Sequence, residues 1–230
     1  MAASMRSKLD LTLVLWSCGH RALLEQTIPA TLNSWPGQVL LVDYGCPEGA
    51  GGWATSLKHK RLRVLTVDAP RHSLGHVIPS RARALNAALN HLDSGVVVLG
   101  DPHVIATQTT YGVVKSQLQD PDQVLVPRPP APGLAGVLAA HVETLTEVGG
   151  YLPAYVGHGA ESPDLRLRLV RNNVTLLQCD LGASVATGHQ VSYFGSIGLL
   201  NSRMDRMAGM TAQLMVLADK PRSMILGLIG

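Results

Sequence analysis

Short apolar runs alternate with helical patterns through the first hundred residues, and this alternation constrains the fold more than any other feature of the chain. Four runs are typical of strands, at 11–15, 39–42, 63–67 and 96–99. Helical patterns at about 21–32 and 78–92 separate them, and a Gly-rich turn at 45–52 leads into a shorter helical segment. Strands joined by helices of this length need right-handed crossovers, which place the strands in a parallel sheet. We therefore predict an α/β fold with a Rossmann-like, mostly parallel central sheet flanked by helices.

The second half of the chain is less regular. The segment 127–133 (PRPPAPG) carries four prolines and is typical of an extended linker, because no helix can include it. Beyond it the pattern predicts a strand at 134–140, a helix at 142–148, a helix capped by Ser162 from 163 to about 172, a strand at 174–177 and an amphipathic helix from 202 to about 217.

Composition narrows the class of protein. A chain of 230 residues with 46% hydrophobic residues suits one domain with a sizeable core. The three cysteines, Cys18, Cys46 and Cys179, match neither a disulfide framework nor a paired zinc motif. The start of the chain lacks a signal-peptide pattern, and no apolar run approaches the roughly 20 residues needed to cross a bilayer. We expect a cytoplasmic protein.

The positive charge is unevenly distributed. The net charge of +3 is too small to indicate a nucleic-acid partner by itself. However, one stretch holds seven basic residues: Lys58, Lys60, Arg61, Arg63, Arg71, Arg81 and Arg83. A solvated helix and strand edge explains such a cluster as well as a phosphate-bearing ligand does, and both interpretations stay open.

The triplet Asp101-Pro102-His103 is a candidate metal site. It follows the apolar run 96–99 after a single glycine, so it lies at the carboxyl end of a predicted strand. Ligands of open α/β sheets bind beyond this edge. A carboxylate with an imidazole suits Mn²⁺ better than Ca²⁺, which prefers an all-oxygen shell. An Asp-Pro turn followed by a surface histidine is the alternative.

Residues 11–190 contain a series of segments that resemble GT-A glycosyltransferases. The segment 40–49 (LLVDYGCPEG) resembles their strand-end signature "VVDDGSxDG", whose leading Asp holds the base of a sugar nucleotide. The resemblance gives this role to Asp43, with Tyr44 replacing the second acidic residue, and adds Ser17 to the donor-binding set. A carboxylate there can accept the ring N–H of uracil. An ordinary Asp in a glycine turn is the alternative.

The segment 75–86 (GHVIPSRARALN) resembles the Gly- and Arg-containing helix that precedes the metal motif in these enzymes. In the family an Arg of this helix faces the diphosphate. The resemblance therefore implies that Gly75, one of Arg81 and Arg83, and Asp101 help to bind the donor. The planar guanidinium fork suits this task. Which of the two arginines is responsible stays open.

The segment 148–165 (VGGYLPAYVGHGAESPDL) resembles "GGYD…WGGENxEL", which marks the acceptor side of family 2-like and polypeptide N-acetylgalactosaminyl-type transferases. Further on, Cys179 and the segment 187–189 (TGH) resemble the "PCSxVGH" of the second family. In that family the strand-end motif is D-x-H and the last His is the third metal ligand. The resemblance implies a metal triad of Asp101, His103 and His189, holding Mn²⁺ or Mg²⁺.

The implied function is a metal-dependent glycosyltransferase that moves a hexosyl or N-acetylhexosaminyl group from a nucleotide sugar, expected to be a UDP-sugar, to an acceptor hydroxyl. Inverting family 2 enzymes use the Asp of a Glu-Asp pair as base. Ser162 occupies that position, which favours retention or moves the base to Glu161 or Asp164. Alternatively, Glu161 is an acid favoured by a helix N-terminus, and Asp164 pairs with Arg168 on the helix surface.

The resemblance implies one GT-A domain over residues 1–230. Its expected parts are a nucleotide-binding half at about 10–105, an acceptor-side half at about 106–200 and a C-terminal helical appendage at about 201–230. The acceptor stays open among a peptide, a glycan, a small molecule and a hydroxylated DNA base. A noncatalytic GT-A-like binding or scaffold protein is the alternative. A nucleotidyltransferase is disfavoured, because 16–21 (WSCGHR) lacks a Gly-rich loop with Arg and Lys.

Overall fold

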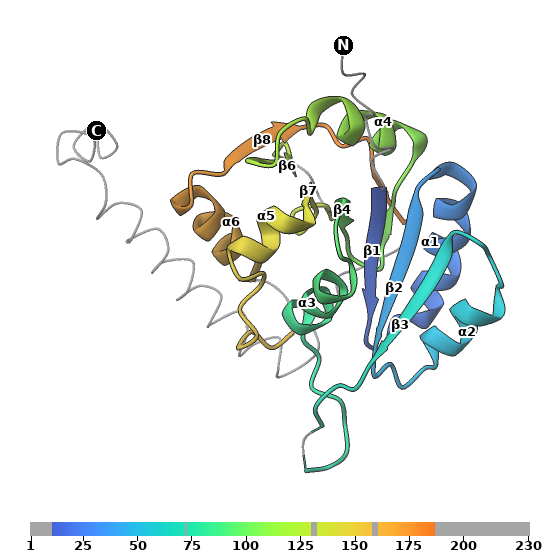
Figure 1. Cartoon of the computed structure of the whole chain (residues 1–230). Coiled ribbons are helices and arrows are strands. Elements are labelled where there is room, and N and C mark those ends of the chain that lie inside the picture. The colour runs from blue at the N-terminus through green and yellow to red at the C-terminus, as the bar shows by residue number, and fades with distance from the viewer. Residues whose placement is uncertain (1–10, 72, 130–132, 158–160, 187–230) are drawn as a thin grey trace.

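The structure is a computed structural model that describes residues 11–71, 73–129, 133–157 and 161–186. One central sheet has the strand order β3-β2-β1-β4-β7-β6-β8 (Figure 1). Its strands are β1 (Leu11–Ser17), β2 (Gln38–Tyr44), β3 (Leu62–Val67), β4 (Val96–Leu99), β6 (Gln123–Pro127), β7 (Leu138–His141) and β8 (Thr175–Cys179). Two short strands, β5 (Val104–Ile105) and β9 (Ser184–Val185), form a separate antiparallel pair.

The strand directions confirm the predicted, mostly parallel sheet. Strands β3, β2, β1 and β4 are parallel neighbours, and β8 is parallel to β6. Strand β7 is antiparallel to both β4 and β6, so it joins the two parallel groups. The result is a mixed α/β architecture. The predicted division into two halves stays a prediction, and the predicted appendage at 201–230 lies outside the described residues.

Helices cover both faces of the sheet (Figure 1). They are α1 (Arg21–Ser34), α2 (Ala50–Ser56), α3 (Arg81–His91), α4 (Gln108–Gln117), α5 (Val142–Glu147) and α6 (Glu161–Arg171). Strand β1 is buried throughout, and its side chains alternate between two cores. Val14 and Trp16 belong to the core shared with α3, α5 and α6. Leu13 and Leu15 belong to the core shared with α1, α2 and α4.

Several element boundaries differ from the sequence prediction. Helix α3 begins at Arg81 and not near 78, because the Ser80 hydroxyl accepts the backbone N–H of Arg83 and caps the helix. Ser162 is not a cap as predicted, since it lies inside the first turn of α6. Strand β7 begins four residues later than predicted, and α4 and β6 were not predicted. The helix predicted at 202–217 lies outside the described residues.

The chain order creates a switch point between β1 and β4. After β1 the chain builds β2 and then β3 on one side, and it returns through α3 to place β4 on the other side. Crossovers that diverge in this way leave room for ligands beyond the carboxyl ends of the two central strands. Trp16 near the end of β1 and Asp101 just after β4 lie on the two sides of this point. Within the described part of the chain, no helix is long and apolar enough to cross a membrane.

Candidate functional site

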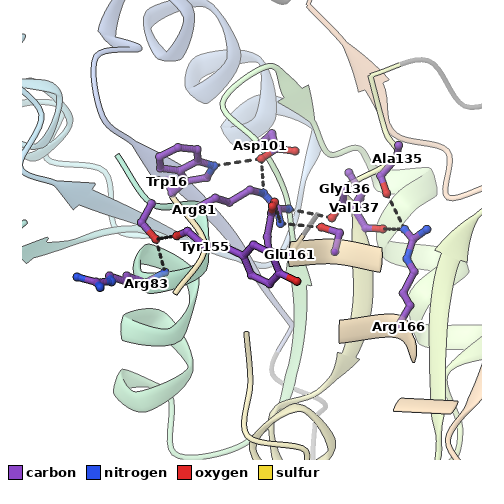
Figure 2. A network of polar contacts seen from close by, with 12 residues as sticks. Trp16, Arg81, Arg83, Asp101, Ala135, Gly136, Val137, Tyr155, Glu161 and Arg166 are labelled. Atoms are coloured by element: carbon purple, nitrogen blue, oxygen red, sulfur yellow. Dashed lines mark hydrogen bonds and ion pairs between the residues drawn. The ribbon is translucent and has the colours of Figure 1, made fainter. Parts of the chain in front are cut away.

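Asp101 is the centre of a polar network at the switch point. Its backbone carbonyl accepts the N–H of Val104, which closes the turn after β4. Its Oδ1 accepts two hydrogen bonds, from Nε1 of Trp16 at 3.0 Å and from Nε of Arg81 at 2.6 Å (Figure 2). No described residue donates a hydrogen bond to Oδ2. The two oxygens of the carboxylate are therefore used unequally, since both donors bind Oδ1.

Arg81 extends this network from α3 to the acceptor-side segments. Its side chain is only 1% exposed. Beyond its ion pair with the aspartate, Nη1 donates to Oγ of Ser162 at 3.0 Å and lies 3.4 Å from Oε1 of Glu161. Nη2 donates to the carbonyl of Gly136 at 2.8 Å. The guanidinium also lies 5.6 Å from the centre of the Tyr151 ring. A single buried cation thus connects the end of β4, the turn before β7 and the start of α6.

The electrostatics of the network keep Asp101 ionised. Burial alone would raise the pKa of its carboxyl group, but the charge of Arg81 and the hydrogen bonds from Arg81 and Trp16 outweigh burial, so the pKa is lowered. The pKa of Arg81 is raised, because the charges of Asp101 and Glu161 oppose the effect of burial. Two carboxylates, those of Asp101 and Glu161, therefore share the charge of Arg81 in this cluster.

His103 lies close enough to Asp101 for its charge to lower the pKa of that carboxyl group. Its Nε2 lies 2.6 Å from the carbonyl oxygen of Gly133. Because a carbonyl only accepts, Nε2 carries a proton in this contact. His189, the third predicted ligand, lies outside the described residues. The described residues contain no group of three or more His, Cys, Asp and Glu side chains that could hold a metal ion.

The residues present fit a divalent cation in their donor chemistry. Asp101 has an ionised carboxylate with one oxygen that accepts no hydrogen bond from the described residues, and His103 places an imidazole close to it. Carboxylate with imidazole is a donor set that suits Mn²⁺. A site with few protein ligands would also suit Mg²⁺, which keeps several waters.

Asp43 has a different environment at the end of β2. Its Oδ1 accepts the backbone N–H of Cys46 at 2.9 Å, and its Oδ2 accepts that of Gly51 at 3.0 Å. The carboxylate therefore holds the Gly-rich turn against the first turn of α2, as in the alternative interpretation of this motif. Ser17, the other predicted donor-binding residue here, is fully buried, and its hydroxyl donates to Sγ of Cys46 at 3.5 Å.

The two candidate arginines of α3 have different surroundings. Arg81 is buried among protein partners, and its predicted role at the diphosphate stays a prediction. Arg83 is exposed, and its Nε donates to the carbonyl of Pro153 at 2.8 Å. Gly75 lies in an exposed loop with a φ of 83°, and its carbonyl accepts a hydrogen bond from Arg71. Of these predicted donor residues, only Arg81 contacts Asp101.

The two predicted catalytic carboxylates, those of Glu161 and Asp164, have different partners. Glu161 is 2% exposed and belongs to the network through Arg81. Asp164 pairs instead with Arg168 one turn later, with 2.8 Å between Oδ2 and Nη2. This is the helix ion pair that the sequence offered as the alternative for Asp164. The geometry thus favours Glu161 over Asp164 as a participant in the site.

Arg61 and Arg63, two basic residues of the stretch at 58–83, have partners within the protein. Arg61 turns inward, where its guanidinium donates to the carbonyls of Leu32 and Trp35 at the end of α1. Arg63 lies 2.8 Å from Nε2 of His91. Both interpretations of the stretch, a solvated edge and a binding surface for phosphates, stay open.

Sequence reasoning missed two members of the site, Trp16 and Gly136. Trp16 follows an apolar run predicted as a strand, so its place near the edge of the sheet could be predicted. Its partner, Asp101, lies 85 residues away, and no local pattern connects the two. Gly136 carries no motif that could have identified it. Its role depends on a contact with residues of other elements.

The chain matches no protein-family model and no curated protein. At the level of structure it is similar to a mannosyltransferase from Pyrobaculum calidifontis in complex with GDP-Man and Mn²⁺, with a TM-score of 0.60 and 17% sequence identity. It is also similar to the glucosyl-3-phosphoglycerate synthase of Mycobacterium tuberculosis in complex with Mn²⁺, UDP and phosphoglyceric acid, with a TM-score of 0.62 and 16% identity.

A third similar structure is GalNAc-T7 with UDP, GalNAc and Mn²⁺, with a TM-score of 0.62 and 14% identity. The matches cover 76%, 90% and 80% of this chain, in the same order. They cover 56%, 79% and 46% of the other chains, so this chain spans about half the length of the mannosyltransferase and of GalNAc-T7. These similarities establish a GT-A fold.

Proposed function

We propose that this protein is a metal-dependent glycosyltransferase that transfers a sugar from a nucleotide sugar to an acceptor hydroxyl. The observation that carries the proposal is Asp101, an ionised carboxylate held by Trp16 and Arg81 at the switch point of a GT-A fold, with one oxygen available. The three similar structures contain Mn²⁺ with a nucleotide or nucleotide sugar, which supports the same ligand chemistry here.

The proposed cation ligands are Asp101 and His103, with His189 as the third. A bound Mn²⁺ or Mg²⁺ would neutralise the charge that develops on the diphosphate as the bond to the sugar breaks. Asp101 would present Oδ2 to the cation, and Arg81 would keep the carboxylate ionised and oriented. Arg81 would thus support departure of the diphosphate through the aspartate and not by direct contact.

Glu161 is the proposed acceptor-side residue. Its carboxylate is held near Ser162 by Arg81 at the start of α6, so it is positioned relative to the same cation site. Ser162 donates or accepts a hydrogen bond but cannot act as a carboxylate base, which favours transfer with retention. Asp43 and Ser17 are the proposed contacts to the base of the nucleotide. Asp43 can still accept a third hydrogen bond, because each carboxylate oxygen has two lone pairs.

The test is an assay of sugar-nucleotide turnover by the full chain. UDP-sugars and GDP-mannose are offered with Mn²⁺, first with water as the only acceptor and then with peptide, glycan and small-molecule acceptors. We expect slow hydrolysis of at least one donor that stops when a chelator removes the cation and returns when Mn²⁺ is restored. The anomeric configuration of the product, read by NMR, then decides between retention and inversion.

A noncatalytic binding protein is the competing outcome of the same experiment. It is favoured if no donor is turned over while a nucleotide and Mn²⁺ together still raise the melting temperature. If neither turnover nor a melting shift is found for any nucleotide, the proposed function is wrong.

A further inference from the structure

The two oxygens of Asp101 are not equivalent. Oδ1 receives the indole N–H of Trp16 from β1 and the Nε–H of Arg81 from α3, and these two donors use both of its lone pairs. A cation can therefore be reached by Oδ2 without breaking either bond. Rotation of the carboxylate would expose Oδ1 only if both hydrogen bonds were given up inside a largely buried network.

Gly136 determines whether Oδ2 can be reached. A Cβ atom at this position would lie 2.8 Å from Oδ2 of Asp101 and 3.1 Å from Nη2 of Arg81. The Asp101 side chain cannot move aside easily, because its other oxygen is pinned by two donors. Gly136 does not belong to the glycines with a positive φ, so its backbone conformation does not require glycine. The space next to Oδ2 is what the missing side chain provides.

We propose that Trp16 and Arg81 restrict Asp101 to a one-oxygen cation ligand, and that Gly136 keeps that oxygen, Oδ2, accessible. Trp16 is in this view a positioning residue, because it acts on the cation through the aspartate. The inference rests on the proposed function, since it concerns the same cation site, but it assigns roles to two residues outside the predicted ligand set.

This arrangement has a consequence for cation selectivity. Ca²⁺ takes six to eight oxygen ligands and often binds both oxygens of a carboxylate. Mg²⁺ is octahedral and takes one oxygen from each ligand. Mn²⁺ accepts the same carboxylate and imidazole donors as the proposed site. A carboxylate with Oδ1 already occupied therefore disfavours Ca²⁺ relative to Mn²⁺. Removing the indole N–H would relax this discrimination.

The experiment titrates the full chain with Mn²⁺, with and without UDP, and follows free Mn²⁺ by electron paramagnetic resonance. Ca²⁺ is then added as a competitor. For Trp16→Phe we expect Ca²⁺ to compete about tenfold better relative to Mn²⁺, the lower end of the 10- to 100-fold effects known for residues that orient metal ligands. For Gly136→Ala we expect Mn²⁺ binding to weaken about tenfold or more.

Two matched variants control for loss of structure. Trp35 is also buried and its Nε1 donates to the carbonyl of Gln38 at 2.9 Å, so Trp35→Phe removes a similar hydrogen bond away from the cation site. Gly112 in α4 has no atom within 4 Å of an added Cβ, so Gly112→Ala is the control for the glycine change. Both should keep the Mn²⁺ affinity and the Ca²⁺ competition of the wild type.

The possible outcomes separate this inference from the proposed function. If the wild type binds no Mn²⁺ in either condition, the proposed function fails and the inference fails with it. If the wild type binds Mn²⁺ but Trp16→Phe and Gly136→Ala behave like their controls, only the inference is wrong. If Trp16→Phe does not fold, as judged by circular dichroism, the Mn²⁺ affinities of Gly136→Ala and Gly112→Ala test the inference.

Discussion

Two aspartates at the same edge of the sheet, Asp43 at the end of β2 and Asp101 after β4, are used in opposite ways. Each has a glycine against its Oδ2: an added Cβ would lie 2.2 Å from that atom at Gly51 and 2.8 Å at Gly136. At Gly51, the backbone N–H of the glycine itself donates a hydrogen bond to Oδ2 of Asp43. Gly136 instead turns its carbonyl to Arg81 and leaves the Asp101 oxygen without a donor among the described residues.

A carboxylate at the end of a strand is therefore not by itself a ligand-binding group. Asp43 meets two backbone amides and stabilises a turn. Asp101 meets two side-chain donors on a single oxygen, and one of them, Arg81, is a buried cation that compensates its charge. Whether such a carboxylate can serve a ligand depends on which of its oxygens the fold has already used.

The largest expected effect distinguishes the two aspartates by activity. Asp101→Asn should lower kcat for donor turnover by roughly 100-fold or more, because it weakens electrostatic stabilisation of the leaving diphosphate. Asp43→Asn should change kcat by less than about tenfold and act mainly on KM and stability, as expected for a group that contributes uniform binding. Steady-state kinetics with saturating Mn²⁺ measures both. Equal losses of kcat in the two variants would contradict the distinction.

The next effect concerns the glycine that closes the Asp43 site. Gly51→Ala should destabilise the protein by about 1–3 kcal/mol, because its Cβ would overlap the Asp43 carboxylate. Gly52→Ala, one residue later in the same helix, meets no atom within 4 Å and should be neutral or stabilising by up to about 1 kcal/mol. Urea unfolding measures both. A Gly51→Ala variant as stable as Gly52→Ala would show that Asp43 does not need this approach.

The smallest expected effect is on the pH dependence of stability and comes from the negative charge of Asp43. No described arginine forms an ion pair with Asp43. Burial, then the neighbouring Cys46 and Asp43, raise the pKa of the Cys18 thiol from 9.0 to about 11. Because the pKa of the Cys18 thiol is higher in the folded than in the unfolded protein, the thiol contributes stability that is fully present below the unfolded pKa. This contribution is lost as the pH rises from about 9 to 11. We expect Asp43→Asn to reduce that loss by a few tenths of a kcal/mol, since a pKa unit corresponds to about 1.4 kcal/mol.

The measurement compares unfolding free energies at pH 8 to 11. Cys18→Ala removes the thiol contribution and isolates it from other groups that titrate in this range. Asp101→Asn is the matched control, because Asp101 is not among the charges that raise the pKa of Cys18. A pH dependence that Cys18→Ala leaves unchanged would show that the thiol does not contribute.

The prediction from sequence succeeded where the signal is local. Strand β4 was predicted with its observed bounds, and α5 ends within a residue of its prediction. By contrast, α4 was missed because its segment (QTTYGVVKSQ) lacks a clear apolar period, although Thr107 forms a capping box at its start. For the candidate site, Asp101 was predicted from its place after a strand, and that role stays a prediction. Ser162 is not the predicted helix cap, since it lies inside the first turn of α6, where its hydroxyl accepts a hydrogen bond from Arg81.

The sequence alone determined the alternation of strands and helices, and therefore the edge of the sheet at which Asp43 and Asp101 lie. It did so because apolar periodicity and turn residues act over a few neighbouring positions. Three further features depend on tertiary packing: the occupied oxygen of Asp101, the burial of Arg81 and the space that Gly136 leaves beside Oδ2. Those facts join residues 20 to 85 positions apart, and they follow from how helices and strands pack and not from any local pattern.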